Sequence, residues 1–154
     1  MSAMIESVTL QTLTTLMQDA GLRVNRSEQN DLVQLLSASQ GIGFAVRLGN
    51  AAAEQDHYLD FTFSCALRIQ GELPQGLVER WNQSRRFARL SCQGEFLVME
   101  MDVQVADGVS EKHLLGNLLL WDRLLQEFIA YLRDFSRQQA ETQPAQAEQV
   151  EAVS

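Results

Sequence analysis

The sequence has few of the residues and patterns that identify an enzyme or a membrane protein. It contains only two cysteines, two histidines and two prolines among 154 residues. No apolar run reaches the ~18 residues that a membrane-spanning helix needs. Residues 1–10 carry neither a basic patch nor the apolar core of a signal peptide. We therefore expect a cytoplasmic protein that does not associate with membranes.

The scarcity of cysteine and histidine also limits the chemistry that the chain can perform. Cys65 and Cys92 fall on the apolar side of alternating segments, so we predict two buried thiols rather than a disulfide. A catalytic cysteine needs a nearby base, and the sequence offers His57 and His113 alone. Neither the spacing of metal ligands nor a glycine-rich phosphate loop is found. We predict no enzyme, no cofactor and no metal site.

Basic side chains are outnumbered, with 12 against 20 acidic ones and a net charge of -8. Such a chain repels phosphate backbones and anionic lipids, so we expect no nucleic-acid partner and no membrane partner. Nucleic-acid binding would require a clustered basic face. The one basic cluster is predicted to be a solvated rim and consists of Arg80, Arg85, Arg86 and Arg89.

The apolar residues that are present give a clear order of elements. They recur every three or four positions in some segments and at every second position in others. The alternating segments are typical of an antiparallel sheet with one buried and one solvated face. The predicted class is α+β, an antiparallel sheet packed by helices in the order α-β-β-β-α-β-β-α. The predicted helices span residues 8–20, 74–84 and 110–137, and the predicted strands span residues 32–38, 42–48, 59–69, 88–92 and 97–105, with a short extended segment over 22–26.

The last predicted helix is apolar on several sides. Its main stripe is predicted to be a dimer or core face and includes Leu114, Leu118, Trp121, Leu125 and Phe128. One stripe suffices to cover a sheet, so the surplus apolar residues indicate either a partner chain or coverage by the first helix. We expect a homodimer of a single domain over residues 1–137. The acidic, Gln/Ala-rich residues 138–154 are predicted to be a disordered tail.

The segment from Leu73 to Leu90 contains the main candidate binding site. In a structural interpretation, Trp81 anchors a short helix on the sheet and Asn82 closes the end of that helix. In a functional interpretation, a groove that binds an acidic or extended protein partner is formed by Trp81, Asn82, Arg85 and Arg89. The residue types fit both interpretations, and we favour the structural one.

A second candidate site would be assembled from dispersed polar residues. Glu100 and Asp102 lie on one face of a predicted strand, and together with His57 they offer an alternative as an enzyme or a small-ligand sensor. Catalytic carboxylates need a cleft and a perturbed pKa, whereas alternate positions on a strand usually face solvent. We therefore predict that these residues are dispersed over a solvated surface.

Several motifs resemble a known family. The Trp81-Asn82 pair is followed by Arg-Phe-Ala-Arg-Leu over residues 86–90, the strand over 97–103, Gly-Val-Ser over 108–110 and the helix with Trp121. With these motifs, residues 9–135 resemble the YbjN family, a bacterial family whose proposed role is the regulation of sensory transduction. The order of elements also resembles that of type III secretion chaperones, which are small acidic homodimers. The resemblance implies a regulatory or chaperone-like module that binds a protein partner and has no catalytic residues.

Overall fold

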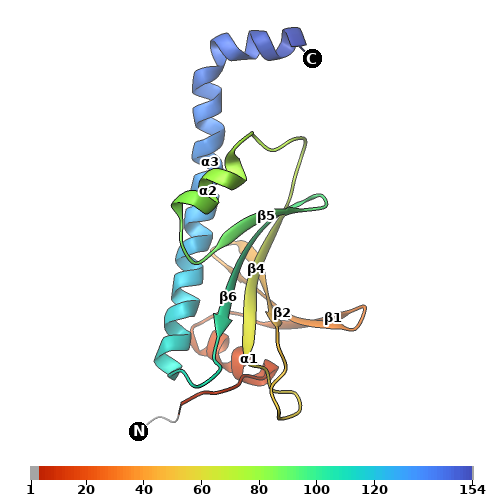
Figure 1. Cartoon of the computed structure of the whole chain (residues 1–154), viewed down its shortest axis with the longest axis vertical. Coiled ribbons are helices and arrows are strands. Elements are labelled where there is room, and N and C mark those ends of the chain that lie inside the picture. The colour runs from red at the N-terminus through yellow and green to blue at the C-terminus, as the bar shows by residue number, and fades with distance from the viewer. Residues whose placement is uncertain (1–3, 154) are drawn as a thin grey trace.

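A computed structural model describes residues 4–153 of the chain, and it describes side chains for residues 4–137. The chain forms a six-stranded sheet with helices packed against it (Figure 1). This arrangement confirms the predicted α+β class. The elements in chain order are α1 (Leu10–Asp19), β1 (Asn25–Gln29), β2 (Leu32–Ser39), β3 (Ile42–Leu48), β4 (Asp60–Arg68), α2 (Leu77–Ser84), β5 (Arg89–Gln93), β6 (Phe96–Gln104) and α3 (Glu111–Val153).

All neighbouring strands of the sheet are antiparallel, in the order β1-β2-β3-β4-β6-β5. Tight turns join the hairpins, and Asn30 and Asp31 between β1 and β2 both have positive φ angles, of 51° and 64°. Such φ angles match the turn type whose twist suits a two-residue hairpin loop. The central strands β4 and β6 pair from Asp60 opposite Gln104 to Arg68 opposite Phe96.

The core lies between one face of the sheet and the helices. The long helix α3 runs along the sheet, with α1 near its first turns and α2 beside its middle (Figure 1). Trp121 of α3 stacks on Phe63 of β4 with ring centroids 5.3 Å apart, and it meets Phe44 of β3 edge-on at 5.9 Å. Aromatic pairs in these geometries add to the stabilisation from burial. Trp121 therefore fixes α3 on the centre of the sheet.

The apolar stripe predicted on the last helix lies in this core. Each of its members is at most 4% exposed: Leu114, Leu118, Trp121, Leu125 and Phe128. Of the large apolar side chains described on α3, Leu115 and Leu119 are exposed. Most apolar side chains of α3 are thus buried within the chain, some of them near α1. The homodimer stays a prediction.

The structure corrects two details of the expected arrangement. The short extended segment expected over 22–26 is replaced by a full strand, β1, over Asn25–Gln29. Its polar residues pair with β2 although they show no apolar alternation. The prediction of two buried thiols holds for Cys65 and is wrong for Cys92, which is exposed. Cys92 lies near the end of the edge strand β5, where alternation alone does not bury a side chain.

Two further expectations concern the C-terminal tail and the absence of a membrane-spanning helix. The last helix was predicted to end at residue 137, whereas α3 continues to Val153. The side chains of residues 138–154 are not described, so the disorder predicted for this tail stays a prediction. In the described part of the chain, no helix has the length and apolar character that crossing a bilayer requires.

Candidate functional site

Trp81 joins α2 to the rest of the domain. Its side chain is fully buried, and its ring packs edge-on against Phe128 at 5.8 Å and against Tyr131 at 5.2 Å. The indole Nε1–H donates a hydrogen bond of 3.1 Å to the carbonyl oxygen of Ala88. Replacing a buried aromatic of this kind with alanine costs about 3–5 kcal/mol. Trp81 is therefore an anchor whose polar atom is already used.

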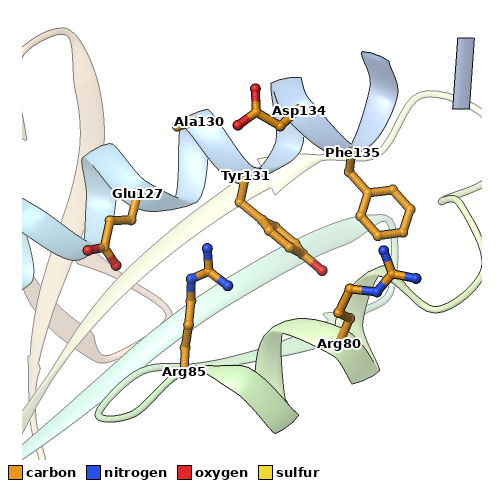
Figure 2. Close-up of a pocket in the computed structure, with 7 residues that line it drawn as sticks. All are labelled: Arg80, Arg85, Glu127, Ala130, Tyr131, Asp134 and Phe135. Carbon is orange, nitrogen blue, oxygen red and sulfur yellow. The ribbon is translucent and has the colours of Figure 1, made fainter. Parts of the chain in front are cut away.

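A groove of about 330 Å³ opens between α2 and α3. In Figure 2, Arg80 of α2 and Arg85, the residue that follows α2, point toward side chains of α3. We call this surface the arginine–aromatic groove. It is lined by Arg80, Arg85, Glu127, Ala130, Tyr131, Asp134 and Phe135.

Both arginines of the groove are held over aromatic rings. The guanidinium carbon of Arg80 lies 5.0 Å from the ring centre of Phe135. The guanidinium carbon of Arg85 lies 4.5 Å from the ring centre of Trp81 and 5.0 Å from that of Tyr131. Each such contact contributes about 0.5–1 kcal/mol at an exposed site. The rings therefore restrict where the two cations can point.

Neither groove arginine has a carboxylate partner among the described side chains. Arg85 donates a 3.1 Å hydrogen bond to the hydroxyl of Ser84, and Glu127 at the rim lies 3.9 Å from Arg123 instead. Among the side chains of residues 4–137, the arginines that lie within 4 Å of a carboxylate are Arg47, Arg68, Arg89 and Arg123. A guanidinium carries five N–H donors, so most donors of Arg80 and Arg85 remain available to a ligand.

Tyr131 connects the groove to the backbone of α2. Its hydroxyl donates a 2.6 Å hydrogen bond to the carbonyl oxygen of Leu77. Burial raises the pKa of the Tyr131 phenol above its ordinary value, although the charges of Arg80 and Arg85 act in the opposite direction. The phenol therefore stays protonated near neutral pH and serves as a fixed hydrogen-bond donor.

The structure separates the four binding residues predicted from the sequence. Arg85 lines the groove, whereas Trp81 lies beneath it. The side-chain amide of Asn82 accepts a 2.8 Å hydrogen bond from the Leu90 N–H and donates one of 3.0 Å to the Leu90 carbonyl. Arg89 points to the opposite face of the sheet, where it lies 3.0 Å from Asp102. The predicted groove does not form from these four residues together.

The groove also contains residues that the sequence analysis did not select. Tyr131 and Phe135 are four positions apart, so they share one face of a helix, and this spacing was the available signal. Arg80 was assigned to a solvated rim with its neighbours. The sequence gives no sign that this face of α3 lies against α2, because that contact joins segments about 50 residues apart.

The second candidate site is dispersed, as predicted for His57, but it is solvated only in part. Glu100 is only 9% exposed on the sheet face away from the helices, in contrast to the solvated position predicted for it. Arg47 forms an ion pair with it, and Arg89 lies 3.7 Å away. The long arginine side chains cover the carboxylate, as arginine stems commonly do. His57 lies elsewhere, hydrogen-bonded to Ser7 at 2.8 Å.

Arg47, Arg89, Glu100 and Asp102 form a cluster of ion pairs, in which Asp102 is the exposed carboxylate. Partial burial acts to raise its pKa, but hydrogen bonds from Thr62 and Arg89, with the charges of Arg89 and Arg47, outweigh burial and lower the pKa. The carboxylate is thus a stable anion near neutral pH, which suits an ion pair better than proton transfer. Within the residues described, no three His, Cys, Asp or Glu side chains gather as metal ligands would.

The matched family covers most of the chain. The sequence pattern described as "Putative bacterial sensory transduction regulator", YbjN, matches residues 9–134. The chain belongs to the YbjN family. The match confirms the family resemblance and includes every groove residue of this YbjN chain except Phe135. No curated protein and no solved structure matches the sequence. The likeness of this YbjN chain to type III secretion chaperones therefore stays a prediction.

Proposed function

We propose that this YbjN protein is a non-enzymatic, chaperone-like regulatory module that binds a segment of a partner protein in the arginine–aromatic groove. The observation that carries the proposal is the state of Arg80 and Arg85. Both guanidiniums are positioned by aromatic rings and have no carboxylate partner among the described side chains. Among the described side chains, Arg80 and Arg85 are the arginines that lie over aromatic rings.

The chemistry of the groove indicates what kind of segment it accepts. A carboxylate of the partner can bind Arg80 or Arg85 through paired N–H donors, a strong and directional arrangement. An apolar side chain next to that carboxylate can pack on the faces of Phe135 and Tyr131. Arginine and aromatic residues together are the types most often found at the energetic centre of protein interfaces.

The acidic residues at the rim narrow the choice of partner. Glu127 and Asp134 line the same groove, so they repel a segment that is acidic along its whole length. We therefore propose a segment with one or two acidic residues beside an apolar one, rather than a polyanion. This preference also agrees with the negative charge of the whole chain.

The groove is better suited to binding than to a reaction. Tyr131 is fixed as a donor to Leu77, and the arginines are permanent cations, so none of these three side chains offers a nucleophile or a base. The other polar groups of the groove are the carboxylates of Glu127 and Asp134, and we propose that they select the partner. We place this role in the cytoplasm, where the two unpaired thiols, Cys65 and Cys92, stay reduced.

A quantitative affinity capture tests the proposal. Tagged full-length protein and an Arg80→Gln/Arg85→Gln variant are used as bait in the native lysate, and captured proteins are compared by mass spectrometry. The matched control is Arg23→Gln/Arg68→Gln, which makes the same change in net charge outside the groove. We expect a partner that is captured by the wild type and the control and is lost from the groove variant.

Binding to a peptide from that partner then locates the contact. Titration calorimetry should show affinity reduced by roughly tenfold or more in the groove variant, since removing one charged hydrogen bond costs at least about 1.4 kcal/mol. Replacing the acidic residues of the peptide with amides should weaken binding to the wild type and have little further effect on the variant. Equal binding to wild type and groove variant, both shown to be folded by circular dichroism, would overturn the proposal.

A further inference from the structure

The two edges of the sheet differ in whether their backbone groups are already used. At the β5 edge, both backbone groups of Leu90 are bound by Asn82, and the carbonyl of Ala88 is bound by Trp81. At the opposite edge, β1 pairs with β2 and has no other strand neighbour in the sheet. An open edge of this kind is a template for another strand. Side chains therefore occupy the start of the β5 edge, at Ala88 and Leu90, whereas the β1 edge is available.

The hairpin geometry determines which β1 residues face outward. Gln29 and Leu32 flank the two-residue turn, so they form a hydrogen-bonded pair, and such pairs alternate along an antiparallel ladder. Ser27 therefore bonds toward β2, whereas the N–H and C=O groups of Arg26 and Glu28 point to the open edge. The same alternation in the β5–β6 hairpin points the N–H and C=O groups of Leu90 outward, and Asn82 binds them there.

The sequence of β1 is complementary to itself when it is read in the antiparallel direction. Asn25–Gln29 reads Asn-Arg-Ser-Glu-Gln, so a second copy aligned on Ser27 places its Glu28 opposite Arg26 and its Arg26 opposite Glu28. We infer that the β1 edge binds the β1 edge of a second copy of this chain, joining the two sheets across a two-fold axis. An interface of this symmetry uses the same residues from both copies, as a self-complementary strand requires.

The outward residues are free to make these contacts. Arg26 and Glu28 are exposed, and no carboxylate or cation lies within ion-pair distance of them among the described side chains. Their neighbours across the hairpin on β2 are Leu35 and Val33, so neither charge is compensated there. In the paired sheets each residue gains both a backbone partner and an opposite charge, and opposite charges directly across strands stabilise a pair.

The contact is short, which sets its strength. Two five-residue strands bury less than the roughly 1,000 Å² typical of a stable specific interface. The dimer is therefore weak and forms as concentration rises. It does not depend on the proposed function, because β1 contributes no residue to the arginine–aromatic groove.

Charge exchange tests the inference on the full chain. Sedimentation velocity is measured over a hundredfold range of concentration for the wild type, Arg26→Glu, Glu28→Arg and the double variant Arg26→Glu/Glu28→Arg. Each single variant sets like charges opposite each other and should weaken the dimer by roughly tenfold. The double variant should restore it, because the swapped charges again face opposites.

An equimolar mixture of the two single variants provides a second, independent readout. It should form a heterodimer, since one copy then presents two acidic residues and the other two basic ones. A wild type that remains monomeric over the whole range would overturn the inference. So would single variants that associate as strongly as the wild type, because the dimer would then use another surface. Circular dichroism of each variant verifies that the hairpin is folded.

Discussion

The side-chain amide of Asn82 binds the backbone of Leu90 as a neighbouring strand would. It accepts the Leu90 N–H at 2.8 Å and donates to the Leu90 carbonyl at 3.0 Å. With the bond from Trp81 to Ala88, this contact satisfies the outward groups at the start of β5. The Trp81-Asn82 pair thus has a structural role, because it joins α2 to the start of the edge strand β5.

Replacing Asn82 with alanine should destabilise the fold by about 1–3 kcal/mol, because both Leu90 groups lose their partner. Urea unfolding followed by tryptophan fluorescence measures the change. Asn82→Asp keeps an acceptor for the Leu90 N–H and places a carboxylate oxygen against the Leu90 carbonyl, so it should not rescue the alanine variant fully. Gln83→Ala, at the exposed neighbouring position, serves as the control and should change stability by less than about 0.5 kcal/mol. A neutral Asn82→Ala would show that water replaces the amide.

Glu100 should matter more than an ordinary surface carboxylate, because it is nearly buried between Arg47 and Arg89. Glu100→Gln leaves these arginines facing a neutral amide and should cost about 1–3 kcal/mol in the free energy of unfolding. Glu95→Gln is the matched control, since its 3.3 Å pair with Arg68 is exposed on both sides and should contribute less than about 1 kcal/mol. Equal effects of the two substitutions in denaturant unfolding would contradict the burial of Glu100.

The lowered pKa of Asp102 predicts a pH dependence of stability with a definite sign. A carboxyl whose pKa is lower in the folded state contributes stability above its unfolded pKa, near 3.9, and loses this contribution as pH falls through the folded pKa. Because Asp102 is exposed, the contribution at neutral pH is at most about 1 kcal/mol. Wild type and Asp102→Asn should therefore differ in urea midpoint at pH 7 and converge on acidification below about pH 4. A difference that grows on acidification would have the wrong sign.

The two thiols should differ in reactivity. Burial raises the pKa of Cys65 to about 11, so its thiol is neither ionised nor accessible in the folded protein, whereas Cys92 is exposed. A chromogenic disulfide reagent at pH 8 should titrate one thiol in the native protein and both in urea. Cys92→Ser should abolish the native reaction, and Cys65→Ser should leave it intact. Rapid labelling of Cys65 in the native state would show that the core around β4 opens readily.

Much of the fold follows from local patterns. The alternation of apolar residues predicts β3 and the paired strands β4 and β6 nearly to the residue, because one face of these strands carries the large apolar side chains of the core and the other carries mostly small or polar ones. Apolar alternation does not predict the strand β1. Its side chains face solvent on both sides, so its place depends on hydrogen bonds to β2, which leave no apolar pattern in the sequence.

The candidate site could be predicted only in part, for the same kind of reason. Trp81 and Arg85 attract notice by residue type, but sequence alone does not decide that Trp81 is an anchor and Arg85 a groove residue. Arg89, only four positions further on, points to the opposite face because β5 turns it there. Tyr131 and Phe135 join the site because α3 packs beside α2.

The sequence by itself determined the class of fold, the acidic surface and the family, since composition, periodicity and short motifs are local properties. Tertiary structure decided which side chains meet. It placed two arginines over aromatic rings, covered Glu100 with Arg47, and bound Asn82 to Leu90 at one sheet edge while β1 remained open. These outcomes depend on contacts between segments distant in the chain, and such contacts are fixed only when the helices pack on the sheet.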